Sequence, residues 1–330
     1  MKVSIYSILK YVTLLGIGLA LLVLAFKGQD FDRLVSDLKS ANYWWVLASA
    51  CACLIAHVLR AVRWNMLIEP LGRGTPTLKN TFSAVMIGYL ANLVFPRMGE
   101  VSRCGVIHKT DRIPLNQLIG TVITERLIDL LMLIVIVGLS ILLQYKLISS
   151  FLYEHLLLKL DDHVSYVSIL VFAGGLLLSA LLVLYIVLKK NHWGFVKKML
   201  ALWSGFSSGL SSVKKIRDKR VFILYSILIW FFYLLSTYLC LFALHALSNL
   251  GPVVALSVLV FGSLGMLAPV QGGIGAFHWI VAEGLTIYSI SKFDGLAYAT
   301  IIHSSQTLLV LFVGLMSMAM VIINSSKQLR

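Results

Sequence analysis

A short stretch that interrupts a long apolar run carries three charged side chains. The stretch reads FPRMGEVSR and places Arg97, Glu100 and Arg103 around a proline–glycine break. A helix that begins near Gly99 would point its first amide groups at the same place, and the planar guanidinium group of arginine matches a phosphate. These residues predict an anion site, and a cytoplasmic loop with solvated charges is the alternative interpretation. Glu100 and Arg103 are one helical turn apart, so they could pair on one face.

A second stretch, TERLIDL, carries Glu125, Arg126 and Asp129 at the start of another apolar run. In a helix the two acids share a face, and Arg126 reaches Asp129 at i+3. Each charge at membrane depth costs ~2.5–3.5 kcal/mol, so such groups pair with one another or face a cavity. The two acids therefore need a cation, a proton or a basic partner such as Arg103 or Arg97. A structural ion-pair network, a proton relay and the wall of a lipid site all remain open.

The composition places these charges in a membrane. The chain of 330 residues is 59% hydrophobic and 13% charged, with a mean hydropathy of +0.91. A soluble domain needs a larger charged shell, so we predict an all-α polytopic membrane protein. The first apolar run could instead be a signal peptide, although no small-residue cleavage pattern follows it. The apolar runs are residues 8–26, 43–62, 78–95, 116–143, 163–188, 220–246, 252–268, 275–290 and 295–323.

Several other functions do not fit the composition. The formal net charge is +14, but the basic residues mostly flank apolar runs, which indicates membrane topology rather than nucleic-acid binding. The four cysteines have neither zinc-site nor disulfide spacing. The GGIG stretch lacks the lysine and the strand–helix context of a nucleotide loop. We therefore expect no metal, no cofactor and no nucleic-acid partner.

Two of the apolar neighbourhoods break in the same way. The stretches GYLANLVFPRMGEVSRCGVI and GSLGMLAPVQGGIGAFHWIV each end an apolar half-segment in Pro-x-x-Gly. Paired breaks in two halves of a chain are typical of the internal repeats of transporters. We predict re-entrant hairpins at 78–110 and 252–290, with two ordinary proline-kinked helices as the alternative. The predicted hairpin-tip residues are Pro96, Gly99, Pro269, Gln271, Gly272 and Gly273. In the second hairpin, Glu283 is a candidate for charge balance or proton relay.

Charge counting predicts the orientation. The basic segment 189–220 should be cytoplasmic, and its apolar residues at helical spacing predict an amphipathic helix at the membrane surface. The loop 27–42 is then external and both termini are cytoplasmic. The first hairpin opens from the cytoplasm and the second from outside, so the repeat is inverted. We predict a single membrane domain over residues 1–330, with about six full transmembrane helices plus the two inverted hairpins, or about eight to ten membrane segments.

Four motifs resemble a known family. RAVRWNMLIEPLG (60–72), GYLANLVFPRMGEVSR (88–103), TERLIDL (124–130) and PVQGGIGAF (269–277) are similar to the membrane domain of the lysylphosphatidylglycerol synthase/flippase family. The resemblance implies a lipid-translocating module with re-entrant helices and a cavity for a headgroup. Because the printed sequence ends at Arg330, soon after the last apolar run, we expect no lysyl-transfer domain. Candidate headgroup residues are Arg60, Arg63, Arg97, Glu100 and Arg103, and candidate charge-balance or proton-relay residues are Glu125, Arg126, Asp129 and Glu283.

These features together favour a flippase-like lipid transporter of the cell inner membrane. Its substrate would be an anionic or modified phospholipid or a polyprenyl-linked lipid. The alternative is a membrane-embedded enzyme, or an enzyme subunit, that modifies a lipid or glycan at a lipid phosphate. A third possibility is a membrane scaffold that partners a separate lipid-modifying enzyme. A transporter is favoured over an enzyme because no catalytic constellation is recognisable in the sequence.

Overall fold

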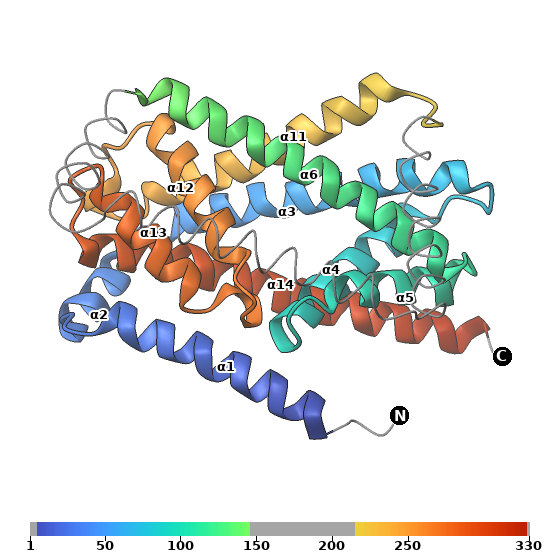
Figure 1. Ribbon diagram of the computed structural model, residues 1–330, viewed down its shortest axis with the longest axis horizontal. Coiled ribbons are helices and arrows are strands. Elements are labelled where there is room, and N and C mark those ends of the chain that lie inside the picture. The colour runs from blue at the N-terminus through green and yellow to red at the C-terminus, as the bar shows by residue number, and fades with distance from the viewer. Residues whose placement is uncertain (1–4, 146–214, 329–330) are drawn as a thin grey trace, which may run out of the picture. The chain divides into compact units, whose positions relative to one another are not determined.

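The computed structural model describes residues 5–145 and 215–328, and every regular element in them is helical (Figure 1). Four of these helices are long and apolar enough to cross a membrane, and a bent pair of helices would make five. The predicted all-α polytopic fold is therefore confirmed. The predicted span 163–188 and most of the predicted amphipathic segment 189–220 lie outside the described residues. The four long helices span Tyr43–Leu71, Leu115–Leu143, Lys219–Leu241 and Lys292–Asn324.

The bent pair consists of α1 (Ile5–Phe26) and α2 (Phe31–Ser40), whose axes differ by 92°. The sequence predicted a loop at 27–42, and α2 corrects that prediction. Asp30 caps α2, since its Oδ1 atom accepts the amide protons of Asp32 and Arg33 at 2.9 and 3.1 Å. Apolar residues at helical spacing then give α2 one buried contact, at Leu34.

The remaining described elements repeat one order twice: a long helix, a pair of short helices and a long helix. The first set is α3 (Tyr43–Ile68), α4 (Leu78–Val94), α5 (Gly99–Asp111) and α6 (Leu115–Leu143). The second set is α11 (Lys219–Leu241), α12 (Pro252–Met266), α13 (Ala276–Thr286) and α14 (Lys292–Gln328). The described residues up to Ser140 and from 215 onward lie in one compact unit.

The two long helices α3 and α11 run antiparallel and form the largest contact between the repeats, and α4 packs against α14 in a second one (Figure 1). The amide of Asn42 donates to the carbonyl of Ala243 at 2.9 Å, near the start of α3 and the end of α11. Further along, the hydroxyl of Ser49 donates to the carbonyl of Ser236 at 2.7 Å. Small residues such as these serines let membrane helices approach closely, and the hydrogen bond across the two helices satisfies the buried hydroxyl of Ser49.

Each pair of short helices folds back on itself as a hairpin. In the first hairpin α4 and α5 touch through glycines, because a Cβ atom on Gly88 would lie 2.8 Å from the carbonyl oxygen of Gly99. The side chain of Asn92 then accepts the amide proton of Gly99 at 2.7 Å, which satisfies the start of α5. In the second hairpin α12 and α13 are equally close, since a Cβ atom on Gly265 would lie 2.7 Å from the Cα atom of Phe277.

The tips of the two hairpins meet. The guanidinium of Arg97 donates to the carbonyl of Leu267 at 3.5 Å, and a Cβ atom on Gly272 would lie 3.0 Å from the side chain of Leu93. Arg97 adopts a left-handed backbone conformation, with φ of 64°, where the chain turns from α4 to α5. The hairpin breaks that the sequence indicated therefore lie side by side in the fold.

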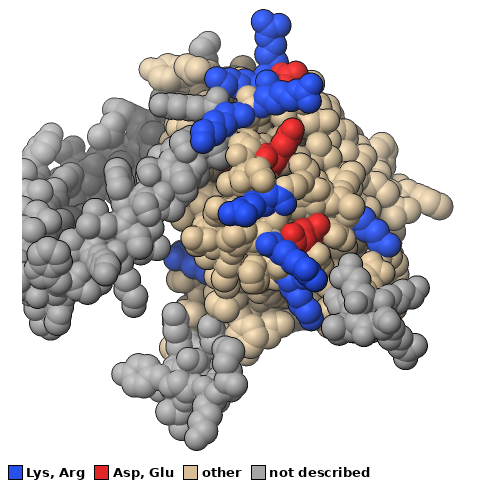
Figure 2. Space-filling model, turned by 90° about the vertical axis from the view of Figure 1, so that its right-hand side faces the viewer, with Lys and Arg blue, Asp and Glu red and all other residues tan. Residues whose placement is uncertain are grey.

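Basic side chains gather at one end of the helices (Figure 2). This end contains the end of α3, the start of α4 and the end of α5, since Asn65 donates to the carbonyl of Pro76 and Asn80 to the carboxylate of Asp111. Such an asymmetry is the one that the positive-inside rule associates with the cytoplasm. The cytoplasmic orientation itself stays a prediction. The exposed basic residues near this end are Arg73, Lys79, Lys109, Arg112, Lys215, Arg217, Lys219 and Arg220.

Candidate functional site

Five charged side chains from three helices are buried against one another. They are Arg60 and Arg63 of α3, Arg103 of α5, and Glu125 and Asp129 of α6. The Nη1 atom of Arg60 bridges both acids, at 2.8 Å from Glu125 Oε1 and 2.9 Å from Asp129 Oδ2. Arg63 Nη2 lies 2.6 Å from Asp129 Oδ1, and Arg103 Nη1 lies 3.0 Å from Glu125 Oε2. We call this set the buried ion network.

Helical spacing brings these residues together. Arg60 and Arg63 lie three residues apart on α3, while Glu125 and Asp129 lie four apart on α6, so each pair occupies one helix face. A tryptophan beside them fixes the register. Trp64 donates its Nε1–H to the hydroxyl of Thr121 at 2.9 Å, which ties α3 to α6. The guanidinium of Arg103 lies 4.6 Å from the centre of the Trp64 ring, a cation–π contact that holds α5 against α3.

The buried ion network lies well inside its helices. Glu125 is ten residues beyond Leu115, the first residue of α6, which corresponds to about 15 Å of helix. Charges buried this far inside helices are costly unless they are paired, and the arginine–carboxylate contacts supply the pairing.

The pairing leaves positive charge and donors in excess. Three guanidinium groups face two carboxylates, so the buried ion network carries one net positive charge. Several buried guanidinium N–H groups have no hydrogen-bond partner: Nε of Arg60, Nε of Arg63, and both Nε and Nη2 of Arg103. Buried polar groups in proteins are nearly always hydrogen-bonded, so these donors of charged side chains can bind a partner such as an ordered water or an anion. An anion would satisfy both the excess charge and the free donors.

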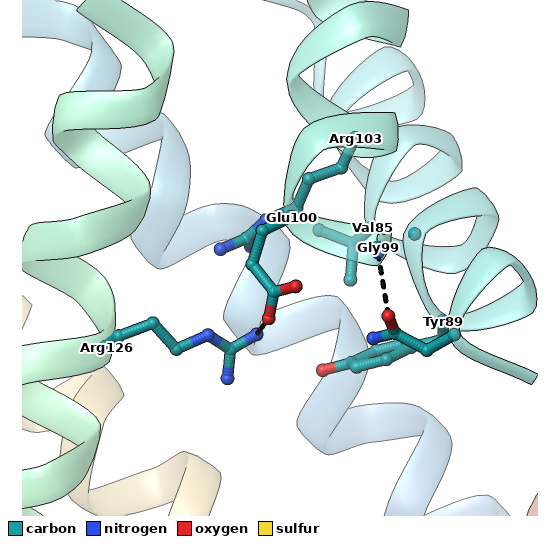
Figure 3. Close-up of a pocket in the computed structure, with 8 residues that line it drawn as sticks. Val85, Tyr89, Gly99, Glu100, Arg103 and Arg126 are labelled. Carbon is teal, nitrogen blue, oxygen red and sulfur yellow. Dashed lines mark hydrogen bonds and ion pairs between the residues drawn. The ribbon is translucent and has the colours of Figure 1, made fainter. Parts of the chain in front are cut away.

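Arg103 faces a small polar cleft between α4, α5 and α6 (Figure 3). Glu100 and Arg126 form an ion pair across it, with 3.2 Å between Oε1 and Nη2. These two side chains are 33% and 42% exposed, in contrast to the nearly inaccessible residues of the buried ion network. The residues that line the polar cleft are Val85, Gly88, Tyr89, Asn92, Gly99, Glu100, Arg103 and Arg126.

An apolar groove adjoins the polar cleft. It lies between α5 and α6 and has a volume of about 340 Å³. Glu100 and Arg126 line both the groove and the cleft, so the two spaces meet at this ion pair. The other residues of the apolar groove are Val101, Cys104, Ile119, Val122, Ile123, Leu127 and Leu130.

The structure brings most of the candidate residues together but changes their pairing. Glu100 pairs with Arg126 and not with Arg103, which is one turn away but binds Glu125 on α6. Arg126 also lies 3.7 Å from Asp129, at the spacing that the sequence indicated. Sequence reasoning did not anticipate that Arg60 and Arg63 are the main partners of the two acids, nor that Tyr89 and Asn92 line the cleft. Polar residues at i and i+3 in the stretch GYLANLVF were the available signal for the latter two.

Two candidate residues lie apart from the buried ion network. Arg97 is exposed and contacts the second hairpin, while Glu283 is exposed and pairs with Lys292. At the second hairpin tip, the carbonyl of Gly272 lies 2.8 Å from Nε2 of His303, whose ring packs against that of His278 at 4.8 Å between centroids. The second repeat thus carries imidazoles near its tip. The role of Glu283 in charge balance or proton relay stays a prediction.

The remaining tip residues also have defined positions. Gln271 and Gly273 are buried within the short helix between α12 and α13, and Gly272 and Gly273 have positive φ angles of 55° and 77°. In the first tip, Pro96 lies directly before the turn at Arg97, and Gly99 is the first residue of α5. Pro269 precedes the corresponding turn of the second hairpin. These residues shape the backbone of the two breaks.

Comparison with known proteins places this arrangement in a family. The family model described as the lysylphosphatidylglycerol synthase TM region matches residues 10–314. A UPF0104 membrane protein of Methanocaldococcus jannaschii is 28% identical over 131 residues, which is 39% of this chain and 37% of that protein. The chain thus matches little more than a third of that relative's length. No solved structure matches the chain. The match over nearly the whole chain shows that this protein belongs to the lysylphosphatidylglycerol synthase TM region family.

Proposed function

We propose that this protein binds the phosphate of a membrane lipid at Arg103 and moves that lipid between the two leaflets of the membrane. The lipid would be an anionic or modified phospholipid or a polyprenyl-linked lipid. The observation that carries the proposal is the pair of unpartnered Arg103 donors, Nε and Nη2, beside a buried ion network with one excess positive charge. A phosphate oxygen would accept from these donors in the fork geometry that arginine favours.

The apolar groove supports a lipid as the ligand rather than a soluble anion. A free phosphate would need only the polar cleft, whereas an amphiphile needs an apolar surface next to the charged one. The polar cleft and the apolar groove share Glu100 and Arg126, so an acyl chain in the groove would place its headgroup next to the cleft, which has a volume of only about 10 Å³ and would have to widen to admit a phosphate. Membership of a family named for a lipid synthase is consistent with a lipid ligand.

The repeated hairpins support movement of the ligand. In transporters, broken helices of two repeats line the substrate site, and access alternates as one repeat moves against the other. Here the two tips contact each other through the long, weak 3.5 Å hydrogen bond from Arg97 to the carbonyl of Leu267. Such a contact can be broken at low cost, as a moving element requires.

The geometry is less favourable to a metal-dependent enzyme. That function would need Glu125 and Asp129 to coordinate a divalent cation through free oxygens. Both oxygens of each acid lie within ion-pair distance of a guanidinium group: those of Arg60 and Arg63 for both acids, and that of Arg103 for Glu125. These two acids already contact three guanidinium groups, so they do not need a further cation, and an anion is the better match for the site.

A leaflet-accessibility assay tests the proposal. Purified protein is reconstituted into vesicles that contain a trace of fluorescent phosphatidylglycerol, and dithionite quenches the outer-leaflet probe. Wild-type protein should make the inner-leaflet probe accessible. Arg103→Gln should abolish this, and Arg73→Gln, a change at an exposed arginine, should not. Translocation by Arg103→Gln at the wild-type rate would refute the site, and no translocation by wild-type protein with any phospholipid or polyprenyl phosphate probe would refute the function.

A further inference from the structure

The ion pair between Glu100 and Arg126 stands where the polar cleft and the apolar groove meet. Both residues line both spaces. Glu100 comes from the first turn of α5 and Arg126 from α6, so the pair closes the space between these two helices (Figure 3). An amphiphile whose chain lies in the groove would bring its headgroup up to this ion pair.

The pair is built differently from its buried neighbours. Its two side chains are 33% and 42% exposed, whereas those of Glu125 and Arg103 are 0% and 4% exposed. An ion pair that the protein encloses only partly can change partners with less rearrangement than a fully buried pair, because breaking a buried pair leaves a costly isolated charge. The Glu100–Arg126 pair is therefore the part of the charged site that can move while the buried ion network stays fixed.

Arg126 also lies within ion-pair distance of a second acid, Asp129. Its Nη1 atom lies 3.7 Å from Asp129 Oδ2, so the guanidinium does not depend on Glu100 alone. A phosphate that approaches Arg103 can accept from Arg126 as well, and this would release Glu100. The net charge of the whole site can then be counted. Four arginines (Arg60, Arg63, Arg103 and Arg126) against three acids (Glu100, Glu125 and Asp129) leave one positive charge. One phosphodiester monoanion neutralises it, whereas a phosphomonoester dianion would not.

We propose that Glu100 and Arg126 form a lateral gate between α5 and α6. A phosphodiester lipid lies with an acyl chain in the apolar groove and enters the polar cleft when its phosphate replaces Glu100 as the partner of Arg126. This inference rests on the proposed function and adds to it the route of the lipid and the charge of its headgroup. The occupant of the groove is an acyl chain because the groove is apolar and continuous with a site for its phosphate.

A reversible cross-link tests the gate. The variant Glu100→Cys/Arg126→Cys is made in a background in which the four native cysteines (Cys51, Cys53, Cys104 and Cys240) are replaced. A bifunctional methanethiosulfonate reagent joins the two positions, and dithiothreitol releases them. In the leaflet-accessibility assay with fluorescent phosphatidylglycerol, the cross-linked protein should fall to the rate of protein-free vesicles. It should recover after reduction, which shows that the same molecules remain folded. The single variant Glu100→Cys with the same reagent is the control.

The outcomes separate the gate from the proposed function. If wild-type protein translocates, Arg103→Gln does not, and the cross-linked variant translocates as fast as its reduced form, the gate is wrong while the site stands.

A second variant, Glu100→Gln, breaks the pair without a cross-link and should raise the rate by up to about fivefold, the factor that an exposed ion pair is worth. A phosphatidylglycerol with a photoreactive acyl chain should label α5 and α6. Labelling confined to other helices, or cross-linking of Leu130→Cys to another segment of this chain, would overturn the assignment of the groove.

Discussion

The substitution Arg103→Lys separates the charge of this residue from its donor geometry. In the structure, Nη1 of Arg103 is used by Glu125 at 3.0 Å, while Nε and Nη2 have no partner. A lysine keeps the positive charge and can keep the contact with Glu125. Its single ammonium group cannot also present two parallel donors to a phosphate. The substitution should therefore preserve the buried ion network and weaken the binding of a phospholipid.

The size of the effect follows from the lost contact. A hydrogen bond to a charged group contributes about 1.5–3 kcal/mol. Loss of one such bond to the phosphate corresponds to a roughly 10- to 150-fold weaker affinity, at about 1.4 kcal/mol for each factor of ten. The cation–π contact with Trp64 also changes, but an ammonium group over the same ring retains part of it. The melting temperature should consequently change little.

The assay measures binding and stability on the same samples. A short-chain phosphatidylglycerol is titrated into detergent-solubilised protein, and the affinity is read by isothermal titration calorimetry beside a thermal unfolding curve. Arg73→Lys is the matched control, since it makes the same change at an exposed position. An Arg103→Lys protein that binds the lipid as tightly as wild type would refute the role of the free guanidinium donors. A protein that loses binding only together with its fold would leave Arg103 a purely structural residue.

Three further outcomes are expected. Glu125→Gln should destabilise the protein by about 3–5 kcal/mol in a denaturant titration, because it leaves buried arginines without their charge partner, and a change below about 1 kcal/mol would contradict the buried ion network. Gly99→Ala should destabilise the first hairpin by about 1–3 kcal/mol, because the added methyl meets the carbonyl of Gly88; the check is the same titration, with Gly105→Ala as a control at a position where a Cβ atom has open space. Glu100→Gln should increase the affinity for phosphatidic acid relative to phosphatidylglycerol in a vesicle-flotation assay, since it removes a negative charge beside the phosphate, and an unchanged ratio would contradict the charge count.

Apolar runs and paired breaks were enough to predict the helical membrane fold. The Pro-x-x-Gly breaks marked both hairpins because proline and glycine interrupt helices wherever they stand in sequence. Helix α2 escaped prediction because its ten residues have a mixed polar composition, and its cap at Asp30 is a local signal that hydropathy does not report. The predicted orientation rests on charge counting alone.

The charged site was harder to predict than the fold. Spacing identified Glu125 and Asp129 as a pair that needs basic partners, but it could not say which helix supplies them. Arg60 and Arg63 meet these acids because their long side chains reach from α3 to α6, and that is a tertiary contact with no local signature. Glu100 and Arg103 illustrate the opposite case: their helical spacing suggested an ion pair with each other, yet each pairs with a residue of α6 instead.

A density map of the protein in lipid nanodiscs would test the central claim most directly. We expect a phospholipid whose phosphate lies within hydrogen-bond distance of Nε and Nη2 of Arg103, with an acyl chain along the groove between α5 and α6. The same map of Arg103→Gln should lack this lipid and keep the helices in place. A wild-type map in which the polar cleft is filled only by water, or in which bound lipids lie solely on other faces, would contradict the account.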